Sequence, residues 1–271
     1  MTDIVHYLLS LEIATISWLQ HTFESIYLLE PFYYINFFGD PRYCFVILAP
    51  LGYIISRKLG ETVLIMASLA EHCNTILKWL TFGHRPYWWA QAFIEEENRP
   101  PIQQRHLTCE TGPGMPSGHV MVSMVTYSVL VGYIVSHSSF KQSNKKFVYG
   151  TFITGICLVA MARLLLAAHF IHQVFFGSVV GICLIRLANS PRFVDITRSK
   201  TILTSLLVFA TGALIYALLW LSGFEPTWTE NYAVKYCLKR EWVRMDTSTL
   251  QGGRKRLPKR FFTLCCTIST C

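Results

Sequence analysis

Charged residues are scarce in this chain. Asp, Glu, Lys and Arg together make up 15% of its 271 residues, whereas hydrophobic residues make up 52%. Soluble domains usually carry about 25% charged residues. The composition therefore argues against a soluble protein and favours a chain that lies mostly in a membrane.

Several familiar sequence signals are also missing. The N-terminus has no basic region and Glu12 interrupts its first apolar stretch, so we expect no cleavable signal peptide. No Asn-x-Ser/Thr glycosylation site occurs. Among the nine cysteines no pair has zinc-ligand spacing, and several lie inside apolar runs. We therefore expect neither a disulfide framework nor a metal site.

Long hydrophobic runs are present, and they predict an all-α, polytopic transmembrane helical bundle. A spanning helix needs about 20 mostly apolar residues. We count six candidate spans, of which the first and fifth are short: residues 43–56, 62–82, 120–135, 147–170, 174–185 and 202–224. We expect these spans to form a membrane domain over residues 42–224. A lumenal or interfacial segment (1–41) precedes it, and a polar, basic tail (225–271) follows it.

The distribution of Lys and Arg in the short loops predicts the orientation in the membrane. The loops after the first, third and fifth spans are basic and are expected to be cytoplasmic. The loop over residues 83–117 then lies on the opposite, lumenal or extracellular side. The tail conflicts with this scheme, because residues 235–260 carry nine Lys or Arg residues. No nucleic-acid-binding motif accompanies the net charge of +8.

A first cluster of functional side chains is formed by two cations. Lys78 and Arg85 are seven residues apart, which places them on one helical face, and Pro86 is expected to end that helix. Two cations on one face can hold an anion. Taken alone, the pair also fits two side chains that extend from a helix end to the membrane surface.

A second cluster, Pro116-Ser117-Gly118-His119, leads directly into a hydrophobic helix. Backbone N–H groups at a helix N-terminus bind anions. Ser117 adds a hydroxyl donor, Gly118 permits close backbone approach, and His119 can protonate a leaving oxygen. The alternative for this segment is an ordinary capped helix start.

The third cluster contains Arg163, His169 and Gln173. Arg163 is costly in a membrane without an anionic partner. His169 is a candidate nucleophile, because imidazole attacks phosphorus well and also leaves it well. Gln173 lies four residues further on, where its side-chain oxygen can orient the imidazole ring. The alternative for His169 is a buried structural histidine.

The three clusters predict more together than each does alone. All fall on the same expected side of the membrane, and none has the carboxylate pattern that holds Mg²⁺ or Ca²⁺. Cations without a metal site suggest that side chains bind a phosphate directly. This pattern is typical of metal-independent phosphoryl transfer, in which positioning and charge stabilisation do most of the catalytic work.

In this combination the chain resembles the superfamily of type-2 phosphatidic acid phosphatases and vanadium haloperoxidases. The signature of that superfamily is K-x6-RP, then PSGH, then SR-x5-H-x3-D. Within it, the chain resembles the glucose-6-phosphatase catalytic subunit family. The residues that carry this second likeness lie at 84–89, 108–114, 166–174 and 241–247. The resemblance extends over roughly residues 10–248.

The resemblance implies a phosphatase core and assigns roles to its residues. His169 would form a phosphohistidine intermediate, and His119 would be the general acid and base. Arg85 and Arg163 match catalytic positions, and Lys78 matches a phosphate-binding position. The implied reaction is hydrolysis of glucose 6-phosphate without a cofactor, at the lumenal face of the endoplasmic reticulum membrane. The implied partners are the membrane lipid and a separate glucose 6-phosphate transporter.

The chain departs from the superfamily pattern at three places. Ala162 replaces the Ser of the third motif, and Gln173 replaces its Asp, as in the glucose-6-phosphatase branch. The family has nine spans, whereas we count six here, and the likeness fades past about Ser248. We therefore expect a C-terminally shortened member whose residues 250–271 are unrelated to the family. Three alternatives stay open: a phosphatase of lipid or other sugar phosphates, an inactive isoform that acts as a binding partner, and a transporter.

Overall fold

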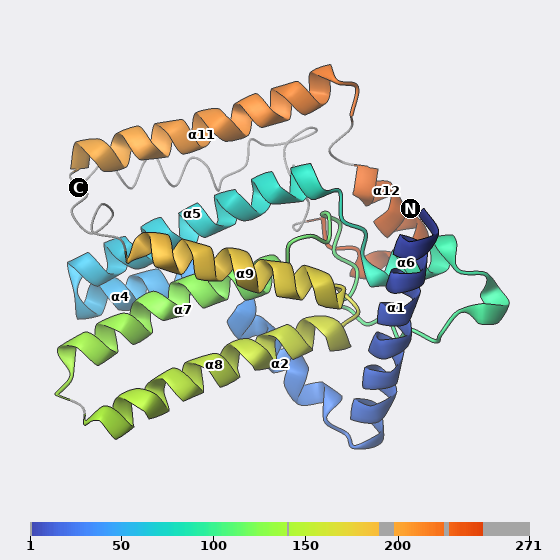
Figure 1. Ribbon diagram of the computed structural model, residues 1–271, viewed down its shortest axis with the longest axis horizontal. Coiled ribbons are helices and arrows are strands. Elements are labelled where there is room, and N and C mark those ends of the chain that lie inside the picture. Colours follow the sequence, from blue (N-terminus) through green and yellow to red (C-terminus); the bar gives the residue numbers. More distant parts are fainter. Residues whose placement is uncertain (1, 140, 190–197, 225–227, 246–271) are drawn as a thin grey trace.

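The computed structural model of the chain describes residues 2–139, 141–189, 198–224 and 228–245 (Figure 1). Within these ranges the chain is helical and contains no β-strand, so the predicted all-α membrane fold is confirmed. The longer helices are α1 (Thr2–Ser25), α2 (Leu29–Gly39), α4 (Ala49–Ile55), α5 (Arg57–Thr81), α6 (Pro86–Phe93), α7 (Gly118–His137), α8 (Gln142–Leu165), α9 (Ile171–Ala188), α11 (Arg198–Leu221) and α12 (Trp228–Tyr236). Short elements are α3 (Pro41–Tyr43), η1 (Cys44–Leu48), η2 (Glu96–Asn98) and η3 (Arg240–Trp242).

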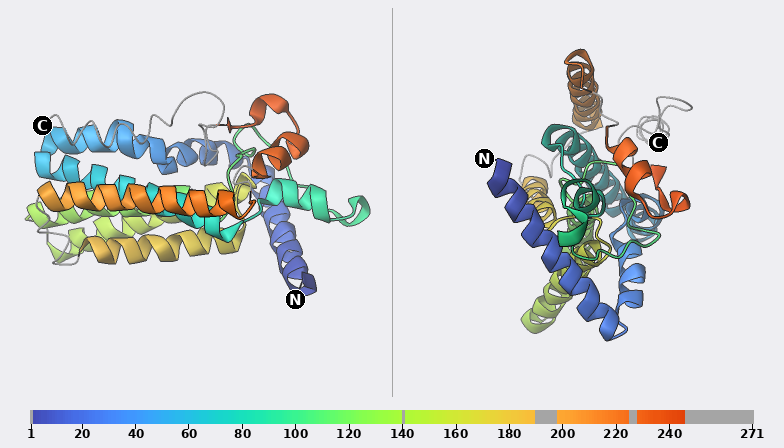
Figure 2. Two further views of the ribbon diagram at one scale, coloured as in Figure 1. Left: turned by 90° about the horizontal axis from the view of Figure 1, so that it is seen from above. Right: turned by 90° about the vertical axis from the view of Figure 1, so that its right-hand side faces the viewer.

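Helices α4, α5, α7, α8, α9 and α11 run side by side as a bundle (Figures 1 and 2). Helix α7 packs against α5, α8 and α9, and α11 lies on the outside against α5. A core of small and flexible apolar residues, including Met66, Ala70, Met121 and Val125, fills the space between α5 and α7. Small residues let helix backbones approach closely, which is typical of helix packing in membranes.

Three of the described helices are long and apolar enough to cross a membrane: α7, α8 and α9. Two shorter apolar stretches, Pro41–Ile55 and Leu206–Leu221, lie in the same bundle. The segments that the sequence predicts as spans are helical over most of their length, and the chain is a helical membrane protein. The count of six spans stays a prediction.

Helix α5 carries its buried residues at helical spacing. Val63, Ala67, Ala70, Asn74 and Lys78 follow one another at intervals of three or four residues, and all five are buried. Such a stripe faces the core of a bundle. Lys78 is the last of these five buried residues, near the end of the helix. Because it lies on the buried face, its ammonium group is directed inward.

The prediction that Pro86 ends the helix of Lys78 is wrong. Helix α5 ends at Thr81, where Phe82 adopts the left-handed conformation with φ 49°. Pro86 instead begins helix α6, with Arg85 as the residue that precedes its first turn. Proline suits the first position of a helix, because the N–H that it lacks would have no partner there.

The predicted span over residues 147–170 is also wrong at its end. Helix α8 ends at Leu165, and helix α9 begins at Ile171. Ala167 adopts a left-handed conformation with φ 50° in the turn between them. That conformation costs a non-glycine residue about 1–2 kcal/mol. His169 therefore lies in a tight turn rather than on a helix, although hydropathy is continuous through this stretch.

Helix α1 crosses one end of the bundle instead of running along it (Figures 1 and 2). Its Glu12 carboxylate accepts hydrogen bonds from the backbone N–H of Ile171 at 2.8 Å and from Nδ1 of His172 at 3.0 Å. A carboxylate at a helix N-terminus interacts favourably with the helix dipole and so stabilises the helix. Glu12 thus fastens α1 to the start of α9. The interfacial role of residues 1–41 stays a prediction.

The expectation of no disulfide is wrong, because Cys109 and Cys237 form a disulfide bond. This bond joins the loop before α7 to the segment after α12. The two cysteines are 128 residues apart, so no local spacing reveals the pair. Of the predicted tail, residues 228–245 pack at the same end of the bundle as α6, and residues 246–271 lie outside the described residues.

Reduction of this disulfide is expected to lower the melting temperature of the protein in detergent. A crosslink that closes a long loop typically contributes about 2–5 kcal/mol of stability. The C109S/C237S variant should melt lower in the absence of reductant and should not respond to it. Cys157→Ser, which removes an exposed free thiol of α8, should keep the wild-type response. Identical melting curves with and without reductant would contradict the expected contribution.

Candidate active site

The predicted site residues gather at one end of the bundle, where four segments meet. These segments are the end of α5, the loop over residues 83–117, the start of α7 and the turn between α8 and α9. All of the predicted side chains are buried there, with 0–8% of their surface exposed: Lys78, Arg85, Ser117, His119, Arg163, His169 and Gln173. Seven polar or ionisable side chains buried together require partners or a ligand.

His169 is held with one ring nitrogen tied and the other turned towards a cation. Nδ1 lies 2.7 Å from the carbonyl oxygen of Gly114, and Nε2 lies 3.5 Å from Nη1 of Arg85. A carbonyl oxygen only accepts hydrogen bonds, so Nδ1 carries the proton in this contact. The lone pair of a neutral ring is then on Nε2. This nitrogen is the one available for attack.

The expected contact between Gln173 and His169 is wrong. The amide of Gln173 accepts from the backbone N–H of Phe170 at 3.1 Å and donates to the carbonyl of His84 at 2.6 Å. The backbone of Gly114, not Gln173, orients the imidazole. Gln173 packs so closely on Gly114 that a Cβ there would meet its side-chain oxygen at 2.7 Å. Gln173 therefore holds the loop that in turn holds His169.

The guanidinium groups of Arg85 and Arg163 share a single carboxylate, that of Glu110. Arg85 Nη1 lies 2.9 Å from one oxygen of Glu110, and Arg163 Nη2 lies 2.7 Å from the other. Arg163 also donates to the side-chain oxygen of Asn36 in α2 at 2.7 Å. All three charged side chains are fully buried or nearly so. Two buried guanidinium groups and one carboxylate leave a net positive charge that suits an anion.

Backbone carbonyls hold the rest of the Arg85 side chain. Its Nε donates to Gly112 at 2.7 Å, and its Nη1 donates to Ala168 at 2.9 Å. Ala168 immediately precedes His169, so Arg85 connects the loop over residues 83–117 to the turn that contains His169. A guanidinium fixed at several atoms loses little entropy when it binds an anion.

The positive charges of Arg163 and Arg85 lower the pKa of the Glu110 carboxyl. Burial alone would raise the pKa of this carboxyl, but the nearby Arg163 and Arg85 guanidinium groups hold it well below the usual range. Glu110 is therefore ionised at neutral pH. Asp40 behaves similarly: burial opposes ionisation, but hydrogen bonds from Arg42 lower its pKa to about 2.

Several buried polar atoms at the site have no hydrogen-bond partner among the described residues. They are the hydroxyl of Ser117, Nε2 of His119, Nε of Arg163 and the side-chain oxygen of Asn74. Buried polar groups are normally paired, so such atoms mark a place where a polar ligand would bind. Ser117 and His119 flank the first residue of α7, where the N–H groups of a helix point at an anion.

Glycine at position 118 lets the side chain of Asn74 in α5 pack directly against this helix start. A Cβ on Gly118 would lie 2.6 Å from the amide nitrogen of Asn74. The turn is also joined to α9, because the N–H of Ser117 donates to the carbonyl of Gln173 at 3.1 Å. Lys78 lies one helical turn from Asn74 on α5 and is within electrostatic range of Arg85 and His169. The phosphate-binding residues expected from the sequence therefore lie close together.

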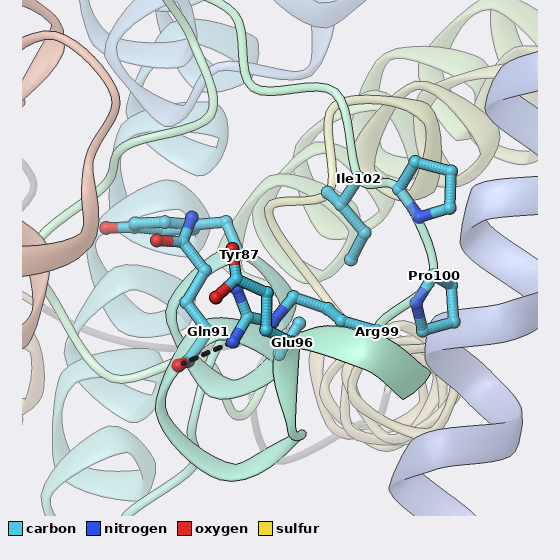
Figure 3. A pocket seen from close by; sticks show the side chains of 8 residues that line it. Tyr87, Gln91, Glu96, Arg99, Pro100 and Ile102 are labelled. Carbon is cyan, nitrogen blue, oxygen red and sulfur yellow. Dashed lines mark hydrogen bonds between the residues drawn. The ribbon is translucent and has the colours of Figure 1, made fainter.

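No cluster of three or more metal-ligating side chains occurs among the described residues. The buried side chains of the site include three cations and two imidazoles, which are groups that can form charge-assisted hydrogen bonds to an anion. A separate cavity of about 260 Å³ opens beside α6 and is lined by Tyr87, Gln91, Arg99 and neighbouring residues (Figure 3). It contains none of the predicted catalytic side chains.

Two residues that bind the arginines of the site were not predicted from the sequence: Glu110 and Asn36. Both lie in segments remote in sequence from the arginines that they bind. One signal points towards an acidic partner. Two arginines predicted at the membrane edge require a buried carboxylate, and Glu110 is the acidic residue nearest to the second cluster.

The amino-acid sequence is similar to those of known phosphatases. Residues 59–194 match the PAP2 superfamily. The chain is 36% identical to mouse glucose-6-phosphatase 3 over 79% of its own length and 63% of that relative. It is 30% identical to human glucose-6-phosphatase 2, over 81% and 66% of the two chains. It is 32% identical to the mouse glucose-6-phosphatase catalytic subunit 1, over 83% and 66%.

The chain thus spans just under two thirds of the length of these curated relatives. No solved structure matches it. The matched region contains Lys78, Arg85, the turn at residues 116–119, Arg163 and His169. The chain belongs to the PAP2 superfamily and, within it, to the glucose-6-phosphatase family.

Proposed function

We propose that the chain hydrolyses glucose 6-phosphate to glucose and phosphate, through a phosphohistidine formed on His169. The observation that carries this proposal is the geometry of His169. Its Nδ1 is tied to Gly114 at 2.7 Å, and its Nε2 lies 3.5 Å from Arg85. A nucleophile with one fixed nitrogen and a neighbouring cation is arranged to attack a phosphoryl group. The names of the relatives identify glucose 6-phosphate as the substrate to test first.

In the first step, Nε2 of His169 attacks phosphorus and the bond between phosphorus and the sugar oxygen breaks. His119 gives a proton to the departing oxygen, so glucose leaves neutral. Arg85, Arg163 and Lys78 balance the charge on the phosphoryl oxygens, and the hydroxyl of Ser117 with the N–H groups at Gly118 adds hydrogen bonds. Two protein groups change their covalent bonds in this step. His169 gains a bond to phosphorus, and His119 loses a proton.

In the second step, His119 has lost its proton and can act as the base. It takes a proton from a water molecule, which attacks the phosphorus bound to His169. The bond between phosphorus and Nε2 breaks, phosphate is released and His169 returns to its neutral form. Imidazole is a good leaving group as well as a good nucleophile, so both steps are accessible. The cycle needs no metal ion.

The membrane setting of this chemistry is part of the proposal. We place the chain in the endoplasmic reticulum membrane with the site at the lumenal face, supplied by a glucose 6-phosphate transporter. The disulfide between Cys109 and Cys237 supports this placement, because disulfides persist in oxidising compartments. This bond lies in the loop that carries Glu110 and so on the same side as the site.

Phosphate release from the full chain in detergent tests the proposed function. Glucose 6-phosphate should be hydrolysed at the same rate with and without EDTA, because cations of the protein replace a metal ion. Phosphatidate, presented in mixed micelles, should be a much poorer substrate. Loss of activity in EDTA that added Mg²⁺ restores would contradict the metal-free mechanism. Preference for phosphatidate would identify the chain as a lipid phosphatase instead.

A further inference from the structure

The segment after α11, residues 228–245, is fastened to the loop that carries Glu110. The Cys109–Cys237 disulfide forms one link. Gln104 forms two more, since its amide donates to the carbonyl of Tyr236 at 3.0 Å and accepts from the N–H of Leu238 at 2.7 Å. Several independent links between two segments indicate that their relative position matters. We call residues 228–245 the tail segment.

The backbone of Arg244 in the tail segment flanks Glu110 on both sides. Its N–H donates to the carbonyl of Cys109 at 2.9 Å, and its carbonyl accepts from the hydroxyl of Thr111 at 2.9 Å. The backbones of Glu110 and Arg244 also form an isolated parallel β-bridge. The position of the Glu110 backbone is therefore set by the tail segment.

The side chain of Arg244 reaches the same carboxylate as the two predicted catalytic arginines. Its Nη1 lies 3.7 Å from an oxygen of Glu110, and its Nη2 lies 3.9 Å from an oxygen of Asp40. Only 13% of the side chain is exposed, so solvent screens these charges weakly. Glu110 thus faces three guanidinium groups, of which two belong to the predicted phosphate site.

We propose that Arg244 is a positioning residue of the phosphatase site, delivered to Glu110 by the disulfide-linked tail segment. Arg244 does not touch the substrate. It compensates part of the charge of Glu110, so that Arg85 and Arg163 stay aligned by this carboxylate and still retain positive charge for a phosphate. Asp40 lies 3.9 Å from the other end of the guanidinium, so its carboxylate attracts Arg244 while it is hydrogen-bonded to Arg42. This inference rests on the proposed function.

Arg244→Lys and Arg244→Gln, made in the full chain, separate this role from simple packing. Both replacements keep the backbone bonds of residue 244, but only lysine keeps the charge. For Arg244→Gln we expect the KM for glucose 6-phosphate and the Kd for inorganic phosphate to rise on the order of tenfold, with a smaller change in kcat. Arg244→Lys should recover most of this loss. Inorganic phosphate binding is measured directly by calorimetry.

The outcomes distinguish the inference from the proposed function. An active wild type whose Arg244→Gln variant has unchanged KM and phosphate Kd would overturn the inference alone. Equal losses in the Lys and Gln variants would also overturn it, because charge would then not matter. A wild type that neither hydrolyses glucose 6-phosphate nor binds phosphate would overturn both. A wild type that binds phosphate without hydrolysis, and loses affinity in the Gln variant, would support the inference and contradict the proposed function.

The disulfide gives a second, independent arm of this test. If the disulfide holds Arg244 near Glu110, reductant should raise the phosphate Kd of the wild type by several-fold. The measurement is made below the temperature at which the reduced protein unfolds. The C109S/C237S variant should show the weaker affinity without reductant and no further change with it. A phosphate Kd that stays the same in the reduced, folded protein would show that the disulfide does not deliver Arg244.

Discussion

Replacement of His169 by Ala or Asn is expected to reduce phosphate release from glucose 6-phosphate by a factor on the order of 10⁴ or more. The reason is that both variants lose Nε2, the atom that would form the bond to phosphorus. Asn retains an amide donor for the carbonyl of Gly114, which accepts from the ring at 2.7 Å in the wild type. The Asn variant should therefore keep the turn intact, so its inactivity would report chemistry rather than unfolding.

His172→Ala is the matched control for this prediction. His172 lies three residues further along the same segment and is paired with Glu12 of α1 rather than with a predicted catalytic group. It should retain most of the wild-type activity. Rates are compared at equal amounts of folded protein, measured by thermal unfolding. A folded His169→Asn variant with wild-type activity would mean that another residue is the nucleophile.

Replacement of Glu110 by Gln is expected to have the largest effect on stability. Glu110 is nearly inaccessible and lies 2.9 Å and 2.7 Å from the guanidinium groups of Arg85 and Arg163. Removal of one partner from a buried ion pair leaves an uncompensated charge and typically costs about 3–5 kcal/mol. Phosphate release should be lost together with stability, because both arginines lose the group that aligns them. The measurement is chemical or thermal unfolding in detergent.

Glu61→Gln provides the matched control for Glu110. Glu61 pairs with Arg57 one turn away on α5, and the exposed fractions of the two side chains are 45% and 75%. An exposed pair of this kind contributes only about 0.3–0.5 kcal/mol. The control should therefore behave like the wild type. A Glu110→Gln variant that is as stable as the wild type would show that the carboxylate does not organise the arginines.

The pH dependence of stability should identify the same carboxylate. The pKa of Glu110 in the folded protein lies well below its ordinary value of 4.5. Its ionisation therefore stabilises the fold above that pH, and this contribution is lost as the pH falls from 4.5 towards the lower, folded pKa. The wild type should lose stability in this acidic window. Glu110→Gln should show a flatter curve there, because its amide does not titrate.

The candidate site residues could be picked out from the sequence because each belongs to a short motif with its own chemical reason, and their catalytic roles stay a proposal. Two cations seven residues apart and a Gly-rich helix start indicated an anion site. The structure brings Lys78, Arg85, Ser117 and His169 to one end of the bundle. The boundaries of their helices were not predictable. Hydropathy continues through the turn at Ala167, where only the backbone conformation shows the break.

The supporting contacts could not be predicted because they join segments that are remote in sequence. Glu110 pairs with arginines 25 and 53 residues away, and Cys109 bonds to a cysteine 128 residues away. No local pattern encodes such distances. Gln173 was assigned to the wrong partner for a related reason. Its helical spacing from His169 suggested a contact, but the helix begins only after His169, and the amide reaches His84 instead.

Direct detection of the covalent intermediate tests the central claim. The full chain is mixed with glucose 6-phosphate labelled at phosphorus, quenched in base, in which phosphohistidine survives, and digested for mass spectrometry. The mechanism predicts label on the peptide that contains His169, with EDTA present, and no label in the His169→Asn variant. Label on another residue, or its complete absence while the wild type continues to release phosphate, would contradict the phosphohistidine mechanism.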